Sequence, residues 1–268
     1  QALSEKFALV AGKMDLTAAG DRNAFAGDAS HTTQFMNTAF NVNPVLFSSG
    51  PYTAMAAGVV LLPTKWLTIS TLVADNDPDG AANMTGFNTA FHGRTWLSVM
   101  QEYDFTIKLF DKPGHQRFGW FYTTKDFIDF SGDPRLSLPG RAQNFGLLPG
   151  RLGPLKLPKP PRWLRSIRLG DTVLSADGPD KRPNDWGIYY NFDQYLYTEP
   201  GDPAQGFGLF GRFGWSTGES NPIEEFYSIG LGGKGSIPHR DRDTWGLGYY
   251  ALNMSDDLPP ALGVDAEH

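Results

Sequence analysis

The chain contains no cysteine among its 268 residues. Disulfide bridges, thiolate metal sites and cysteine nucleophiles are therefore excluded. No apolar run reaches the about 18 residues of a transmembrane helix, so none is expected. Charge is also scarce, because only 19% of the residues are charged and the formal net charge is -6. Basic residues gather in one local cluster only, which argues against nucleic-acid binding.

The two ends of the chain lack the usual marks of a complete secreted protein. Residues 1–13 have neither the basic start nor the small-residue cleavage site of a signal peptide. The chain starts at Gln1, without Met, and ends abruptly at His268. We therefore expect an internal part of a longer precursor, with residues 1–268 forming a single, incomplete domain.

Glycine, proline and aromatic residues are abundant. The chain has 31 Gly and 20 Pro, and 13% of its residues are aromatic. Such a composition is typical of many extended segments joined by turns rather than of a helical bundle. The sequence therefore predicts an all-β fold.

Side-chain character alternates with period 2 in several segments, as in strands with two unlike faces. Between Trp96 and Phe110, one parity carries Leu97, Val99, Tyr103, Phe105, Ile107 and Leu109, with Gln101 as an exception. The other parity carries mostly polar residues. About nine such strands are predicted: Glu5–Asp15, Thr53–Pro63, Trp66–Ala74, Arg94–Phe110, Arg117–Ile128, Asp185–Tyr197, Gly206–Trp215, Ile223–Lys234 and Thr244–Asn253.

The connections between these strands differ in length. Short turns are expected at residues 63–65, 111–116, 199–205 and 235–243, and long loops at 16–51, 74–93 and 128–185, while 216–222 is a shorter loop. This pattern indicates an antiparallel up-and-down transmembrane β-barrel of porin type. A soluble β-sandwich that binds or cleaves glycans is the alternative. The two differ in whether the apolar parity faces outward or packs onto a second sheet.

Four short motifs carry a resemblance to a known family. They are Gly230–Gly248 (GLGGKGSIPHRDRDTWGLG), AGKMD at residues 11–15, QFMNTAF at residues 34–40 and GRFGWSTGESNP at residues 211–222. In this order they resemble the carbohydrate-selective outer-membrane porins of the OprB family. The resemblance implies a barrel of about sixteen strands, of which this chain carries about nine.

The resemblance also implies a function. We expect passive, sugar-preferring diffusion of small carbohydrates across the bacterial outer membrane, with no reaction catalysed and no cofactor. The expected partners are outer-membrane lipid and small carbohydrates, and not nucleic acid; the oligomeric state stays open between monomer and homo-oligomer.

The polar parity of the strands is expected to line the pore, where hydrogen-bonding and aromatic groups would contact sugars. The alternation predicts the residues Glu102, Asp104, Lys108, Arg117, Tyr189, Asn191, Asp193, Arg212 and Tyr250. Lys13 and Asp15, which share a parity, match the Gly-Lys-x-Asp part of the family pattern and are added as pore-lining candidates. For each residue the alternative is a merely hydrated wall, or for Lys13 and Asp15 a salt bridge at a strand end.

Signals for other chemistry are weak. The five histidines are far apart, and Asp75, Asp77 and Asp79 resemble a calcium loop but lack its closing Glu. Gly230, Gly232 and Gly235 have dinucleotide-loop spacing without a following helix. No catalytic or metal site is therefore predicted. The basic stretch of residues 155–168 lies in the longest loop, and the sequence leaves open whether it folds into the pore.

Overall fold

A computed structural model describes residues 2–4, 6–27, 35–77, 96–130, 166–169, 172–175, 181–235 and 240–257. Ten strands form the main sheet: β1 (Ala2–Ser4), β2 (Phe7–Asp15), β3 (Thr53–Thr64), β4 (Leu67–Asp75), β5 (Leu97–Leu109), β6 (Lys112–Ile128), β9 (Lys181–Glu199), β10 (Asp202–Ser216), β11 (Ile223–Lys234) and β12 (Thr244–Met254). A separate pair consists of β7 (Ser166–Leu169) and β8 (Thr172–Ser175).

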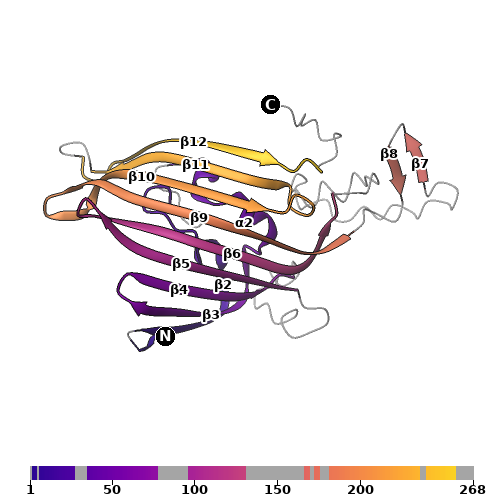
Figure 1. Cartoon of the computed structure of the whole chain (residues 1–268), viewed down its shortest axis with the longest axis horizontal. Coiled ribbons are helices and arrows are strands. Elements are labelled where there is room, and N and C mark those ends of the chain that lie inside the picture. Colours follow the sequence, from indigo (N-terminus) through magenta and orange to yellow (C-terminus); the bar gives the residue numbers. More distant parts are fainter. Residues whose placement is uncertain are drawn as a thin grey trace.

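The order of the strands in the main sheet follows the order of the chain, from β1 to β6 and then from β9 to β12. Every neighbouring pair is antiparallel. This confirms the predicted up-and-down arrangement and all nine predicted strands, to which the structure adds the short β1. In the described residues the sheet remains open, with the short β1 at one edge and β12 at the other. Figure 1 shows β12 along the upper edge.

Some strands are longer than predicted. β6 begins at Lys112 rather than Arg117, because the turn after β5 consists of only Phe110 and Asp111. Both residues have positive φ values, 55° and 59°. This is the geometry of a two-residue type I′ hairpin, whose twist matches that of the flanking strands. β9 likewise begins at Lys181 rather than Asp185.

The apolar parity of the strands lies on one exposed face of the sheet. Leu247 and Tyr249 of β12 are 72% and 70% exposed, and Leu97, Ile188 and Trp245 are also exposed. No second sheet covers this face in the part of the chain that the structure describes. The sandwich alternative is therefore wrong, and these large apolar side chains form an outward surface suited to lipid.

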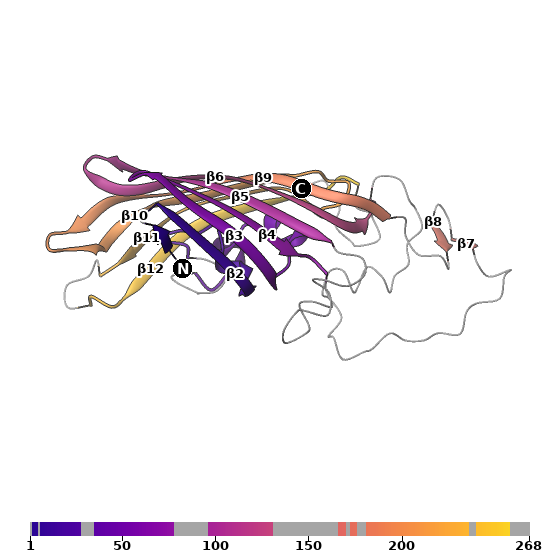
Figure 2. The same ribbon diagram turned by 90° about the horizontal axis from the view of Figure 1, so that it is seen from below.

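The opposite face is concave and is covered by residues that were predicted to be a long loop. Within residues 16–51 the structure has η1 (Leu16–Ala18), α1 (Thr38–Asn41) and α2 (Pro44–Ser49). We call residues 20–27 and 35–50 the inner segment. Figure 2 shows that it lies beneath the arch of the strands. None of the described helices is long and apolar enough to cross a membrane.

Local sequence explains why the inner segment contains helical turns. Asn37 and Asn43 are the N-caps of α1 and α2, and their side chains accept hydrogen bonds from the backbone N–H groups of Ala39 and Val45. Pro44 occupies the first turn of α2, where its missing N–H costs nothing. Both helices are short, so their position depends on packing against the sheet.

A hydrophobic core lies between the inner segment and the sheet. Phe25, Phe35 and Phe40 of the inner segment pack around Phe210 of β10, which has no exposed surface. The rings of Phe35 and Phe40 stack at 4.5 Å, and Phe35 meets Phe210 edge-on at 5.2 Å. The sheet thus has its buried side on the concave face, which is the reverse of its lipid-facing side.

Candidate functional site

The polar residues of the concave face meet the inner segment at Asp21. The backbone N–H of Asp21 donates to Glu102 Oε2 of β5 at 2.8 Å. Its Oδ1 accepts from Asn191 Nδ2 of β9 at 2.6 Å and from Arg212 Nε of β10 at 3.0 Å. Its Oδ2 accepts from the backbone N–H of Asn43 at 2.9 Å. One residue therefore contacts three strands and the start of α2.

Arg212 binds the backbone of the inner segment as well as the carboxylate of Asp21. Its Nη2 donates to the carbonyl oxygens of Asp21 and Gly27, each at 2.8 Å, and its Nη1 donates to that of Phe40. The Arg212 side chain has no exposed surface. Because Asp21 is the anionic partner of this buried guanidinium, the pair is charge-compensated and hydrogen-bonded.

Asn23 adds a second contact between the inner segment and β9. Its Nδ2 donates to Asn191 Oδ1 at 2.8 Å and to the carbonyl oxygen of Phe192 at 2.9 Å. Its Oδ1 accepts from the backbone N–H groups of Phe25 and Ala26. The Asn23 side chain thus stabilises the local turn and also attaches that turn to β9.

A row of alternating charges lies beside Asp21. Arg117 of β6 forms ion pairs with Asp193 at 2.6 Å and with Asp104 at 3.3 Å. Asp104 in turn contacts His115 Nδ1 at 2.8 Å. The Asp104 and His115 side chains are 24% and 33% exposed. The row therefore runs from the buried interface to a partly solvent-exposed rim, formed by Asp104 and His115.

Most of the predicted pore-lining residues come together at this interface. Tyr189 donates to Glu102 Oε2 at 2.9 Å, and Tyr250 accepts from Asn37 Nδ2 of the inner segment at 3.3 Å. The residues brought together are Glu102, Asp104, Arg117, Tyr189, Asn191, Asp193, Arg212 and Tyr250. Lys108 has the same parity but lies exposed near the turn end of β5.

Lys13 and Asp15 do not join this group. In the pairing register Lys13 lies opposite Met55. The next pair, Met14 and Ala54, faces the concave side. Because facing residues in an antiparallel pair share a side, Lys13 and Asp15 lie on the outward parity. Asp15 instead accepts hydrogen bonds from the backbone N–H and hydroxyl of Thr17, at 3.0 and 2.5 Å, at the start of η1. The prediction that Lys13 and Asp15 face inward is therefore wrong.

A second polar cluster, which the sequence reasoning missed, holds the far end of the inner segment. Asp185 of β9 is 1% exposed and accepts hydrogen bonds from the Ser49 hydroxyl of α2 and from Ser220 at 3.1 Å. Asn221 Nδ2 donates to the carbonyl oxygen of Val45 at 3.1 Å and to Ser49 Oγ at 3.1 Å. Residues of the GRFGWSTGESNP motif thus attach α2 to the wall.

The glycines of the concave parity make room for the inner segment. A Cβ built on Gly208 would lie 2.6 Å from the Phe25 ring, and one on Gly248 would lie 2.6 Å from the Phe40 ring. A Cβ on Gly214 would meet the Asn43 side chain at 2.4 Å. The glycine-rich strands β10, β11 and β12 are therefore sockets for side chains of the inner segment, rather than only a thin wall.

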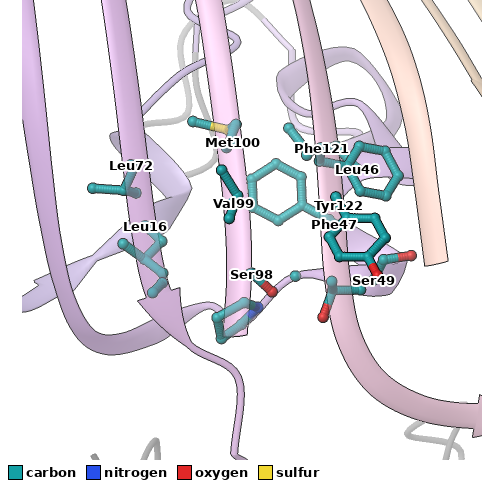
Figure 3. A pocket seen from close by; sticks show the side chains of 14 residues that line it. Leu16, Leu46, Phe47, Ser49, Leu72, Ser98, Val99, Met100, Phe121 and Tyr122 are labelled. Atoms are coloured by element: carbon teal, nitrogen blue, oxygen red, sulfur yellow. The ribbon is translucent and has the colours of Figure 1, made fainter. Parts of the chain in front are cut away.

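A small cavity remains beside α2. Figure 3 shows Leu46 and Phe47 of α2 together with Leu72, Met100 and Phe121 of the sheet. Its volume is about 50 Å³ and its lining is mainly apolar. The cavity is too small for a sugar.

No cluster of three metal-ligating residues occurs among the described residues. Asp75 and Asp77 of the calcium-like stretch are described, and Asp77 N donates to Asp75 Oδ1 at 3.1 Å, whereas Asp79 lies outside the described residues. The basic stretch at 155–165 and most of the longest loop also lie outside them. Among the site residues that the sequence did not predict are Asp21, Asn43 and Asp185. A local signal exists for Asp21, in a Gly-Asp-Arg-Asn turn, and for Asn43, in an Asn-Pro helix start, but not for Asp185.

Comparison with known proteins agrees with this fold. A sequence model described as "Carbohydrate-selective porin, OprB family" matches residues 2–262. A solved chain, the high pH structure of Pseudomonas putida OprB, matches with a TM-score of 0.69 and 18% identity, over 96% of this chain and 53% of that chain. The low pH structure of the same protein matches with a TM-score of 0.46 and 12% identity, over 94% and 50%. No curated protein sequence matches significantly. The chain spans about half the length of these solved relatives.

Proposed function

Because the chain belongs to the OprB family of carbohydrate-selective porins, we propose that it supplies part of the wall and the constriction of a channel for small carbohydrates. Proteins of this family lie in the bacterial outer membrane. Sugars diffuse passively through the channel, and the family and fold indicate a channel rather than an enzyme.

The observation that carries this proposal is the separation of the two faces of one sheet. The outward face exposes large apolar and aromatic side chains, whereas the concave face holds a hydrogen-bonded layer of charges and amides. A channel wall needs this division, because one face meets hydrocarbon and the other meets water and solute. Width and hydrogen-bonding groups then select the solute.

The rim is where we expect sugars to be recognised. At the rim Asp104 presents carboxylate acceptors and His115 presents a ring nitrogen, beside the buried cation Arg117. A sugar hydroxyl both donates and accepts hydrogen bonds, so it finds partners there. A lining with charges of both signs also favours neutral solutes, because a pore lined by charges of one sign would concentrate counter-ions instead.

Liposome swelling with the refolded complete gene product tests the proposal. Neutral sugars of increasing size and charged solutes of similar size are compared, with protein-free liposomes as the control. We expect neutral monosaccharides to enter fastest and the rate to fall with size. Folded protein that excludes sugars would contradict the proposal, and faster entry of anions than of neutral sugars would indicate an anion porin instead.

A further inference from the structure

Asp21 has an unusual backbone conformation for a residue that is not glycine. Its φ is 55°, in the left-handed region, and its side chain is 2% exposed. Such a conformation costs free energy for most L residues, although Asp and Asn tolerate it better than others. It persists where surrounding contacts determine it. The contacts of Asp21 are sufficient, because its N–H, its carbonyl oxygen and both carboxylate oxygens have partners.

We infer that Asp21 is the positioning residue of the inner segment and that, through the segment, it sets the size limit of the channel. The inference rests on the proposed function. Glu102, Asn191 and Arg212, the wall partners of Asp21, come from β5, β9 and β10. Asp21 therefore links the inner segment to three strands of the wall.

The side of the inner segment that faces away from the wall carries the exposed residues. Met36 is 94% exposed and Thr38 is also exposed, whereas Phe35 and Phe40 on either side are buried. If the inner segment shifts away from the wall or along it, this exposed side changes the width of the channel that remains open beside it. Because pore diameter is a main determinant of selectivity, such a shift changes which sugars pass.

The chemistry requires a carboxylate at this position. All three groups that approach the Asp21 side chain are donors: Asn191 Nδ2, Arg212 Nε and the N–H of Asn43. Asparagine would replace one acceptor by an NH₂ group, which would then face a donor, and it would leave the Arg212 guanidinium without its anion. Asparagine keeps the tolerance for positive φ. Asp21→Asn therefore removes the carboxylate while leaving the backbone preference in place.

Loss of Asp21 is expected to release only one end of the inner segment. The α2 end is held separately by Asp185, Ser49 and Asn221, none of which contacts Asp21. The strand pairing does not involve the Asp21 side chain either. The variant should therefore keep its sheet and change its constriction.

Single-channel conductance in planar bilayers and liposome swelling test this inference on the complete gene product. For Asp21→Asn we expect larger or noisier open-channel current, and a rise of at least about twofold in the permeability of trisaccharides relative to monosaccharides. Asp256→Asn is the matched control, because Asp256 is exposed beyond the end of β12. It should behave like the wild type.

A second variant approaches the same contact from the wall. Arg212→Lys keeps the charge but loses the fork that reaches Asp21, Gly27 and Phe40, and we expect a change in the same direction. It also serves as the test if Asp21→Asn fails to fold, as judged by heat-dependent mobility in gels. Folded variants with wild-type conductance and size limit would overturn the inference while leaving the proposed function intact. Wild-type protein that passes no sugar would instead overturn the proposed function.

Discussion

Phe25 of the inner segment lies directly against Gly232 of β11, and a Cβ built on that glycine would be 2.7 Å from Phe25 Cβ. Gly208 of β10 completes the socket around the same ring. The tight approach shows that the wall and the inner segment are packed together as one body. A side chain at position 232 is incompatible with the observed position of Phe25.

The first prediction is that Gly232→Val displaces Phe25 and destabilises the fold. Overpacking at a buried contact typically costs about 1–3 kcal/mol. Unfolding by guanidinium in micelles, followed by tryptophan fluorescence, measures the change. Gly246→Val is the control, because Gly246 is the cross-strand partner of Gly232 but is exposed. Equal stability of the two variants would contradict the predicted socket.

The second prediction uses the absence of native cysteine. The variant with Phe25→Cys and Gly232→Cys should form a disulfide on mild oxidation, because a small displacement from 2.7 Å reaches the about 3.5–4.5 Å between Cβ atoms in disulfides. Mobility in non-reducing gels detects it. Phe25→Cys combined with Leu231→Cys should stay reduced, since Leu231 has the outward parity. Oxidation of both pairs to the same extent would contradict the observed packing of Phe25 against Gly232.

The third prediction concerns the outward face. Leu247→Arg should impair insertion into bilayers, because an Arg on the lipid face costs up to about 2–4 kcal/mol at the bilayer centre and less toward the interfaces. Leu247 is 72% exposed, so the same change would be harmless on a water-facing surface. Thr244→Arg, at the turn end of β12, is the control and should insert normally. Insertion is measured by flotation with vesicles. Unimpaired insertion of Leu247→Arg would argue that this face does not meet lipid.

The fourth prediction concerns the second polar cluster. Asp185→Asn should lower the free energy of unfolding by about 1–3 kcal/mol, because buried hydroxyl and amide donors lose an acceptor. These donors include Ser49, Ser220 and Asn221. Guanidinium unfolding measures the effect, with Asp256→Asn as the exposed control. A variant as stable as the control would show that α2 is held mainly by its apolar contacts.

The sequence by itself determined the strands and their two faces. Alternation between neighbours such as Ile188 and Tyr189 is a local property, and a strand turns successive side chains to opposite sides whatever the rest of the chain does. The nine strands, the outward apolar face and the inward position of residues such as Glu102 and Arg212 could therefore be predicted. The short motifs were enough to indicate the family.

The tertiary structure alone decided what the inward residues contact. Residues 16–51 have no strong periodicity, and their helical turns are too short to be stable without the sheet. Asp21 acquires its role from Glu102, Asn191 and Arg212, which lie 81, 170 and 191 residues away along the chain. No local pattern encodes contacts at such separations. The sequence thus specified a sheet with one polar face. Only the folded arrangement of that sheet placed the inner segment against the polar face and buried most of the charged side chains there.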